Sequence, residues 1–263
     1  MPIDFFKYQG TGNDFILING FQMPADAFNR TDPKLIQKMC DRKFGIGADG
    51  LMVLEKSDKA DFTLWFYNPD GSQSFCGNGS RCAVRFATDQ GMVTKNEMTF
   101  EAFDGLHDAR VEGNEISISM RNVNEIKRDK NGVFINTGSP HLVLEKNSLN
   151  DINVIDVGRK LRYDELYAPV GTNVNFFEVV PGGIKIRTYE KGVEDETLSC
   201  GTGVTACALV FAASYATEPR VMVETRGGKL EVSFEQHFSV FEKVRLKGPA
   251  EYVFKGVYVE RER

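Results

Sequence analysis

One short pattern occurs twice in this chain. Cys76-Gly77-Asn78-Gly79 is followed by an Ala-containing run that predicts a helix over 81–89, and Cys200-Gly201-Thr202-Gly203 precedes one that predicts a helix over 204–215. The first N–H groups of a helix have no partner inside it, so they can bind an anion. Their partial positive charge also favours the thiolate form of a nearby cysteine. The doubled pattern therefore predicts a site with one thiol on each side of a bound carboxylate.

The resemblance between the two halves extends beyond these loops. The turn and strand at 12–17 correspond to 139–144 with a shift of 127, and the strand at 63–67 corresponds to 185–189. A nearly constant shift is typical of an internal duplication. It predicts two similar α/β lobes, with the two cysteine loops facing each other across a cleft.

The other elements follow from local signals. Thr31-Asp32-Pro33 starts a predicted helix that ends near Cys40, and a polar helix is expected over 151–161. The segments 127–130 and 190–198 are charged and are predicted to be loops. Cys40, Cys82 and Cys207 are interpreted as packed, inert thiols, because they lie within predicted helices.

Composition narrows the class of protein. The chain has 263 residues, 41% of them hydrophobic and 26% charged, as in an ordinary globular protein. A net charge of −5 argues against broad nucleic-acid binding, and no apolar run is long enough to span a bilayer. The N-terminus lacks the pattern of a signal peptide, so we expect a cytoplasmic protein.

The cysteines and histidines argue against a metal site or a disulfide framework. The five cysteines contain no C-x-x-C pair, and the three histidines have no H-x-x-x-H spacing. A phosphate-binding Walker motif is also absent, so we expect no metal, nucleotide or other cofactor.

Two thiols on opposite faces of an amino-acid carboxylate suit inversion at the carbon next to it. A thiolate on one face removes the α-proton while a thiol on the other face supplies one. The backbone N–H groups of both helix starts would meet the charge that develops on the carboxylate oxygens.

The chain resembles the diaminopimelate epimerase family. The resemblance covers the whole chain in order and is carried by Gly12-Asn13-Asp14-Phe15, Tyr67-Asn68-Pro69-Asp70-Gly71-Ser72, Cys76-Gly77-Asn78-Gly79-Ser80-Arg81-Cys82, Tyr189-Glu190-Lys191-Gly192-Val193 and Glu196-Thr197-Leu198-Ser199-Cys200-Gly201-Thr202-Gly203. The resemblance implies a PLP-independent isomerase. It would interconvert LL- and meso-2,6-diaminopimelate by a two-base cysteine mechanism, for lysine and peptidoglycan synthesis.

The resemblance also implies a fold and an assembly. It implies an α/β (α+β) protein of two pseudo-symmetric lobes, each a mostly antiparallel sheet or barrel wrapped around a central helix. The N-terminal lobe would be 1–118 with a closing strand from 251–263, and the C-terminal lobe 119–250. Homodimers are common in the family.

Carried over by position, the family's site residues fall into three groups. Cys76 and Cys200 resemble the acid/base pair, and His141 with Glu190 resembles the pair that sets their ionisation. The groups that resemble substrate ligands are Asn13, Asn68, Gly77, Asn78, Asn173, Glu190, Lys191, Gly201 and Thr202. Three positions depart from the family: Lys191 replaces arginine, Ser139 replaces a frequent asparagine, and Gly50 stands where some members have glutamine.

Other functions fit parts of this pattern. A racemase of the same fold would share the thiols but would not need groups for a second carboxylate and amine. A thiol-free isomerase of the fold is disfavoured by the two cysteines. A redox sensor could join Cys76 and Cys200 in a switchable disulfide, and only an absence of turnover would favour it over an epimerase.

Overall fold

The computed structural model describes residues 2–23, 28–215 and 217–260. The described chain is a mixed α/β protein made mostly of strands with few helices, which confirms the predicted fold class. Contacts divide it into two compact units, Met1–Ile118 with Pro249–Arg263, and Ser119–Gly248. The predicted lobes also included 1, 24–27, 216 and 261–263, which lie outside the described residues. We call the two parts unit 1 and unit 2 and describe each by itself.

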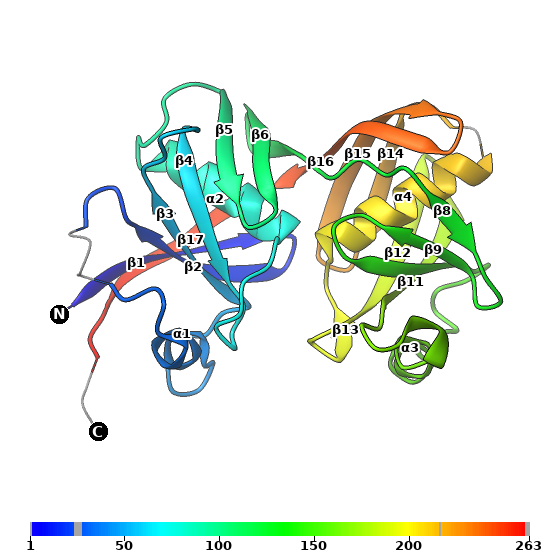
Figure 1. Cartoon of the computed structure of the whole chain (residues 1–263), viewed down its shortest axis with the longest axis horizontal. Coiled ribbons are helices and arrows are strands. Elements are labelled where there is room, and N and C mark those ends of the chain that lie inside the picture. Colours follow the sequence, from blue (N-terminus) through cyan, green and yellow to red (C-terminus); the bar gives the residue numbers. More distant parts are fainter. Residues whose placement is uncertain (1, 24–27, 216, 261–263) are drawn as a thin grey trace. The chain divides into compact units, whose positions relative to one another are not determined.

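Unit 1 is a curved sheet around one helix. Its strands pair in the order β17-β1-β2-β3-β4-β5-β6-β7, with β2–β3 and β4–β5 parallel and the other pairs antiparallel. Helix α2 (Gly77–Asp89) packs against the strands of this sheet (Figure 1). The strands are β1 (Ile3–Gly10), β2 (Asn13–Asn19), β3 (Gly50–Glu55), β4 (Phe62–Tyr67), β5 (Glu97–Ala102), β6 (Gly105–Glu112), β7 (Glu115–Ser119) and β17 (Glu251–Tyr258).

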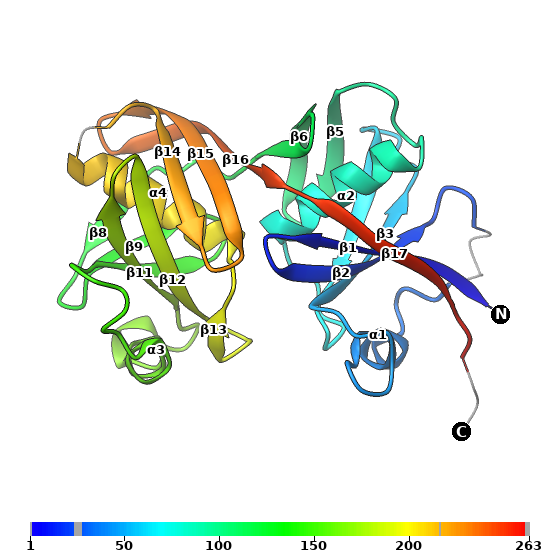
Figure 2. The same ribbon diagram turned by 180° about the vertical axis from the view of Figure 1, so that it is seen from behind.

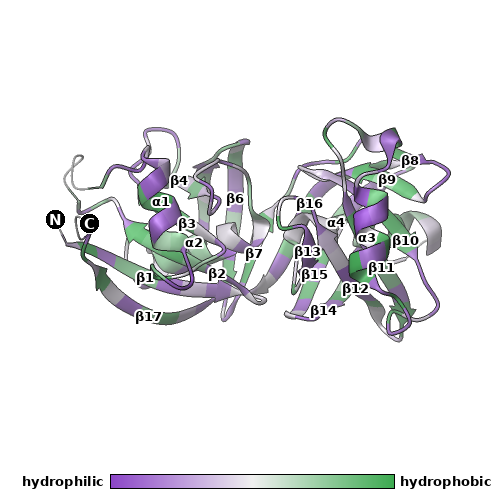
Figure 3. Cartoon of the chain, turned by 90° about the horizontal axis from the view of Figure 1, so that it is seen from below, coloured by the Kyte–Doolittle hydropathy of each residue, from purple (hydrophilic) through white to green (hydrophobic). Residues whose placement is uncertain are grey.

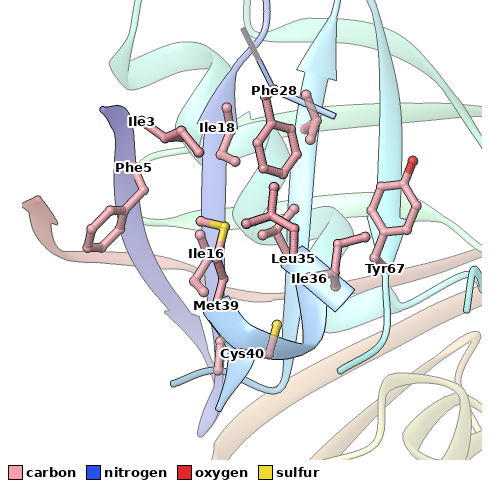
Figure 4. Close-up of a cluster of buried hydrophobic side chains, with 13 residues drawn as sticks. Ile3, Phe5, Ile16, Ile18, Phe28, Leu35, Ile36, Met39, Cys40 and Tyr67 are labelled. Atoms are coloured by element: carbon pink, nitrogen blue, oxygen red, sulfur yellow. The ribbon is translucent and has the colours of Figure 1, made fainter. Parts of the chain in front are cut away.

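A second helix, α1 (Pro33–Cys40), covers another part of unit 1. The side chain of Asp32 caps it by accepting a hydrogen bond from the Lys34 N–H, as the sequence predicted. Its apolar face packs into a buried cluster with residues of β1, β2 and β3 (Figure 4). Cys40 belongs to this cluster, and burial raises the pKa of its thiol to about 12, so it is an inert packing residue.

Unit 2 repeats the plan of unit 1. Its strands pair in the order β8-β9-β10-β11-β12-β14-β15-β16, again with the third and fifth pairs parallel, and the short β13 also pairs with β12. Helix α4 (Gly201–Tyr215) is packed against these strands, with its first twelve residues all buried. The strands are β8 (Ile126–Arg128), β9 (Val133–Asn136), β10 (Pro140–Glu145), β11 (Asn173–Val180), β12 (Gly183–Glu190), β13 (Asp195–Thr197), β14 (Arg220–Thr225), β15 (Gly228–His237) and β16 (Val240–Pro249).

Short helices also occupy matching places in the two units. Helix α3 (Val154–Arg162) lies between β10 and β11, as α1 lies between β2 and β3, and a 3-10 turn (Glu165–Tyr167) follows it. Both helices have a hydrophilic outward side (Figure 3). The matching order of strands and helices is that of an internal duplication. Figure 2 shows β17 lying alongside β1, in the place that β8 takes beside β9.

The structure corrects the alignment of the two halves by one residue. Phe15 pairs with Tyr8 and with Gly50, and His141 pairs with Ile135 and with Asn173. Gly50 and Asn173 each precede the residue that pairs with the matching tyrosine, Tyr67 or Tyr189, so Phe15 and His141 are equivalent, a shift of 126 in place of the predicted 127. The turn between β9 and β10 has three residues, 137–139, and the turn between β1 and β2 has two, 11 and 12, a difference that the sequence pattern did not show.

Several predicted boundaries were also wrong. Helices α2 and α4 begin at Gly77 and Gly201, four and three residues earlier than predicted, because their glycines are poor helix formers that packing nevertheless holds in the first turn. The predicted loop 190–198 contains β13, and the predicted loop 127–130 contains part of β8. Both strands are only three residues long and carry charged side chains, so they lack an apolar pattern.

Candidate active site

Cys76 is the N-cap residue of α2. Its backbone is extended, and its Sγ accepts a hydrogen bond from the Gly79 N–H at 3.4 Å. Its carbonyl oxygen accepts from the Ser80 N–H at 2.8 Å, which begins the helix. The sulfur thus lies at the positive end of the helix, where a thiolate is stabilised. Cys76 is half-buried, whereas Gly77 and Asn78 are buried.

A hydrogen-bonded chain ties this helix start to the hairpin between β1 and β2. Asn78 Nδ2 donates to Asn13 Oδ1 at 2.5 Å, and Asn13 Nδ2 donates to Asp49 Oδ2 at 3.1 Å. Asp49 is held in turn by Arg42, 2.6 Å away. Two predicted site residues, Asn13 and Asn78, are therefore in direct contact, and Asp49 is a supporting residue that the sequence analysis missed.

Arg81 lies fully buried in the first turns of α2. Its guanidinium donates to Thr11 Oγ1 at 3.2 Å and to the Gly77 carbonyl oxygen at 3.5 Å, both neutral acceptors. Burial lowers the pKa of Arg81 to about 10, and interaction with Cys82 and then Cys76 opposes this shift. The group is still charged at neutral pH, so a positive charge beneath the loop favours an anion at Cys76.

Asn68 belongs to the turn that follows β4. Its Nδ2 donates to Ser72 Oγ at 3.0 Å and to Ser74 Oγ at 3.2 Å. Gly71 in this turn has φ +86°, a conformation that favours glycine. The side chain of Asn68 therefore braces the loop that leads to Cys76.

Cys200 directly precedes α4 in unit 2. Its carbonyl oxygen accepts from the Val204 N–H at 2.8 Å, and its Sγ lies 3.5 Å from Thr202 Oγ1. Its exposed fraction is 7%. Gly201 and Thr202 form the first turn of the helix, in the positions that Gly77 and Asn78 have in α2.

His141 is fully buried beside this turn. Its Nε2 lies 2.9 Å from Thr202 Oγ1 and 3.0 Å from Ser139 Oγ, and its Nδ1 lies 3.0 Å from Asn175 Nδ2. Burial lowers the pKa of His141 to about 3, so the imidazole is neutral at physiological pH. Ser139, at a position where the family often has asparagine, thus takes part in the network through its hydroxyl.

Asn173 connects this cluster to the end of β12. Its Nδ2 donates to Ser139 Oγ at 3.1 Å and to the Pro140 carbonyl oxygen at 2.9 Å, and its Oδ1 accepts from the Lys191 N–H at 2.9 Å. The Lys191 ammonium donates to the Val170 carbonyl oxygen at 3.5 Å. Asn173 therefore holds the backbone at the end of β12, where Glu190 and Lys191, two further predicted site residues, lie.

The structure gives His141 and Glu190 different hydrogen-bond partners. His141 bonds Ser139, Thr202 and Asn175, whereas Glu190 accepts from Thr197 Oγ1 at 2.8 Å. Asn175 was missed by the sequence analysis. It follows Asn173 by two residues in β11, and this spacing places both amides on the same face of the strand, a signal that was available.

The other described groups give no further reactive centre. Cys82 and Cys207 are fully buried, and burial raises the pKa of both thiols, as expected for packing residues. In the described part of the chain, no three His, Cys, Asp or Glu side chains are grouped so that they could hold a metal ion. Among the same residues, no helix has the length and apolar character needed to cross a membrane.

Solved structures share this fold. The chain aligns with a PhzF-family phenazine biosynthesis protein of Bacillus anthracis with a TM-score of 0.78 at 13% identity, covering 99% of this chain and 100% of the other. It aligns with a hydroxyproline epimerase from Agrobacterium vitis with a TM-score of 0.72 at 15% identity, covering 97% and 92%. At these identities the likeness establishes the fold.

Sequence relatives define the family. A model of the family described as diaminopimelate epimerase matches residues 5–125 and 133–253. The diaminopimelate epimerase of Flavobacterium psychrophilum is 51% identical over 254 residues, covering 95% of this chain and 98% of that protein. That of Aquifex aeolicus is 39% identical, covering 97% of both. The protein is thus an isomerase of the epimerase class. The chain belongs to the diaminopimelate epimerase family, as its motifs predicted.

Proposed function

We propose that this protein interconverts LL- and meso-2,6-diaminopimelate without PLP or a metal, using Cys76 and Cys200 as its acid/base pair. The observation that carries the proposal is the repeated arrangement of a cysteine at a helix start in two units of the same topology. Membership of the family supports the substrate.

In the proposed reaction each cysteine acts on one face of the α-carbon. The thiolate takes the α-proton, so that a C–H bond breaks and an S–H bond forms. The electron pair moves onto the carboxylate, and the thiol on the opposite face then gives its proton to the carbon. The two sulfurs end with exchanged protonation states, and no oxidant or external base is needed.

The backbone N–H groups at the helix starts would stabilise the charged intermediate. These are the amides of Gly77, Asn78, Gly201 and Thr202. A general acid/base pair contributes only about 10²–10⁴-fold to a rate, so preorganised donors must supply much of the remaining acceleration. Arg81 adds a buried positive charge on the Cys76 side.

The substrate's distal end would be held by polar residues around the two loops. We assign this role to Asn13, Asn68, Asn173, Glu190 and Lys191. Lys191 keeps the positive charge of the arginine usual in the family but presents a single ammonium in place of a planar fork. His141, with Glu190, would influence the ionisation of the thiols.

We also propose that the enzyme supplies lysine and peptidoglycan synthesis in the cytoplasm and acts as a homodimer. The exposed apolar side chains of β17 support self-association, because such patches commonly mark interaction sites. They are Tyr252, Val253, Phe254 and Val257. Sedimentation velocity tests this part, since a monomer at micromolar concentration would contradict it.

The function is tested by incubating the protein with diaminopimelate isomers in heavy water. We expect inversion at one α-carbon with incorporation of one deuterium, unaffected by a chelator. Proline and hydroxyproline in parallel reactions distinguish a racemase of the same fold. Turnover of these, with none of diaminopimelate, would refute the assignment.

The two cysteines are tested by Cys76→Ser and Cys200→Ser. Each variant should lose at least about 10²-fold in kcat, because a serine hydroxyl is a far weaker acid than a thiol. Cys40→Ser is the matched control, since Cys40 is packed in the α1 cluster. Normal epimerisation by both active-site variants would contradict the mechanism.

A further inference from the structure

The strands beneath the Cys200 loop carry polar side chains at positions where the strands beneath the Cys76 loop carry apolar ones. Strand register makes three pairs of positions equivalent: Phe15 and His141, Met52 and Asn175, Phe66 and Thr188. The neighbours of Gly79 and Gly203, the third residues of α2 and α4, agree with this equivalence. A Cβ on Gly79 would lie 3.3–3.4 Å from Phe66 and Met52, and one on Gly203 would lie 2.5 Å from Asn175 Oδ1.

The orientation of the Asn175 amide follows from its neighbours. Its Nδ2 lies 3.2 Å from the Leu142 carbonyl oxygen, which can only accept, so the NH₂ group must face that way. Its Oδ1 accepts from Thr188 Oγ1 at 3.0 Å. The second hydrogen of the NH₂ group points to His141 Nδ1, 3.0 Å away.

This contact determines where the proton of neutral His141 lies. Because Nδ1 accepts from Asn175, the ring proton is on Nε2. Nε2–H then points to Thr202 Oγ1 at 2.9 Å and to Ser139 Oγ at 3.0 Å, and these two hydroxyl oxygens lie 3.3 Å apart. Because Ser139 Oγ accepts from Asn173 Nδ2, its own proton can be donated to Thr202 Oγ1, which leaves the Thr202 proton available for Cys200 Sγ, 3.5 Å away.

We propose that Asn175 is a positioning residue that holds His141 in the Nε2–H tautomer, so that the Thr202 hydroxyl donates to the Cys200 sulfur and stabilises its thiolate. The catalytic consequence rests on the proposed function. Two other titratable groups act on the cluster. Lys191 opposes protonation of His141, and Cys207, buried in α4, interacts with Cys200.

The tautomer is tested directly by ¹⁵N NMR of protein labelled at histidine. The chain has three histidines, so His107→Gln and His237→Gln assign the signals. We expect His141 to show a protonated Nε2 and an unprotonated Nδ1 from pH 6 to pH 9. A protonated Nδ1 in the wild-type protein would overturn the proposal, whatever the variants do.

The effect on the thiol is tested by alkylation as a function of pH, with peptide mass mapping to follow Cys76 and Cys200 separately. Asn175→Leu and Thr202→Val should each raise the pKa of Cys200 by about one to two units, the value of a hydrogen bond to a charged group. The pKa of Cys76 should stay constant. Thr202→Ser keeps the hydroxyl and should restore the wild-type value, and Met52→Leu is the matched control at the equivalent position of unit 1.

A Cys200 pKa that is unchanged in Thr202→Val, or equal in the Val and Ser variants, would refute the relay. In the pH profile of kcat, the limb that reports the ionisation of Cys200 should shift in Asn175→Leu by the same one to two pH units as the pKa. The KM should stay nearly constant. The NMR and alkylation experiments need no turnover. A protein inactive on diaminopimelate would therefore refute the proposed function without deciding the relay.

Discussion

At the scale of single residues, the two cysteines share a motif but have different neighbours. Arg81 provides a buried cation near Cys76, and the equivalent residue of α4 is the neutral Thr205. Cys200 instead has the hydroxyl of Thr202 and, behind it, a neutral His141. The duplicated pattern is thus chemically asymmetric, because the residues that touch the loop come from distant strands.

The buried His141 predicts a pH dependence of stability. Its pKa in the folded protein is about 3, below the value of about 6.5 expected in the unfolded chain. Protons therefore bind the unfolded state more strongly, and the stability that neutral His141 contributes above pH 6.5 is lost as pH falls towards 3. Between pH 7 and pH 5 this loss amounts to about 2 kcal/mol.

Urea unfolding of wild type and His141→Gln at both pH values measures this contribution. The His141→Gln variant should be less stable than wild type at pH 7. Its free energy of unfolding should fall by about 2 kcal/mol less than that of wild type between pH 7 and pH 5. His237→Gln is the control on the surface of β15. An equal pH dependence in wild type and His141→Gln would mean that His141 is not held neutral.

At the scale of elements, the starts of α2 and α4 depend on glycines that the sheet requires. Gly79 and Gly203 are both buried in the first turn, where their lack of a side chain allows the helix to approach the strands. Local propensity argues against a helix at these positions, which is why the predicted helices began too late.

This contact predicts different outcomes for the same substitution in the two helices. A Cβ at Gly203 would lie 2.5 Å from Asn175 Oδ1, whereas the nearest atom to a Cβ at Gly79 is Phe66 Cε2 at 3.3 Å. Gly203→Ala should lower the free energy of unfolding by about 1–3 kcal/mol, the cost of overpacking, and Gly79→Ala by clearly less. Urea unfolding followed by circular dichroism measures both. Equal decreases in the free energy of unfolding would show that Asn175 moves aside as readily as Phe66 and Met52 do.

At the scale of the whole molecule, the chain returns to unit 1 at its end. Strand β17 pairs with β1 along its length, and aromatic rings of the two strands are in contact. The ring centroids of Phe254 and Phe5 lie 6.0 Å apart, and those of Tyr252 and Tyr8 lie 5.5 Å apart. A strand from the far end of the sequence thus completes the sheet of the first unit.

Deletion of residues 251–263 should therefore destabilise unit 1 selectively. Trp65, the only tryptophan, belongs to β4 of unit 1, so its fluorescence reports the unfolding of that unit. We expect its urea midpoint to fall sharply, while the amides of α4 keep their protection from hydrogen exchange. A tryptophan midpoint equal to that of the full chain would contradict this role of β17.

Much of this organisation was predictable from local patterns. The Thr31-Asp32-Pro33 start predicted α1, and the Cys-Gly repeats predicted two helix starts behind cysteines. Very short strands were not predictable, because β8 and β13 owe their pairing to neighbours and carry no apolar alternation. The spacing of Asn175 from Asn173 was a signal in the sequence, but the role of Asn175 depends on partners in other strands, His141 and Thr188.

The family, the internal duplication and the two Cys-Gly loops can be recognised from the amino-acid sequence alone, because motifs and periodicity are properties of neighbouring residues. The register of the repeat and the side chains beneath each loop become known only from the folded chain. Register depends on which strands pair, and a change of one residue replaces Leu142 by His141 as the counterpart of Phe15. The difference between the two thiol environments therefore arises from packing between distant segments.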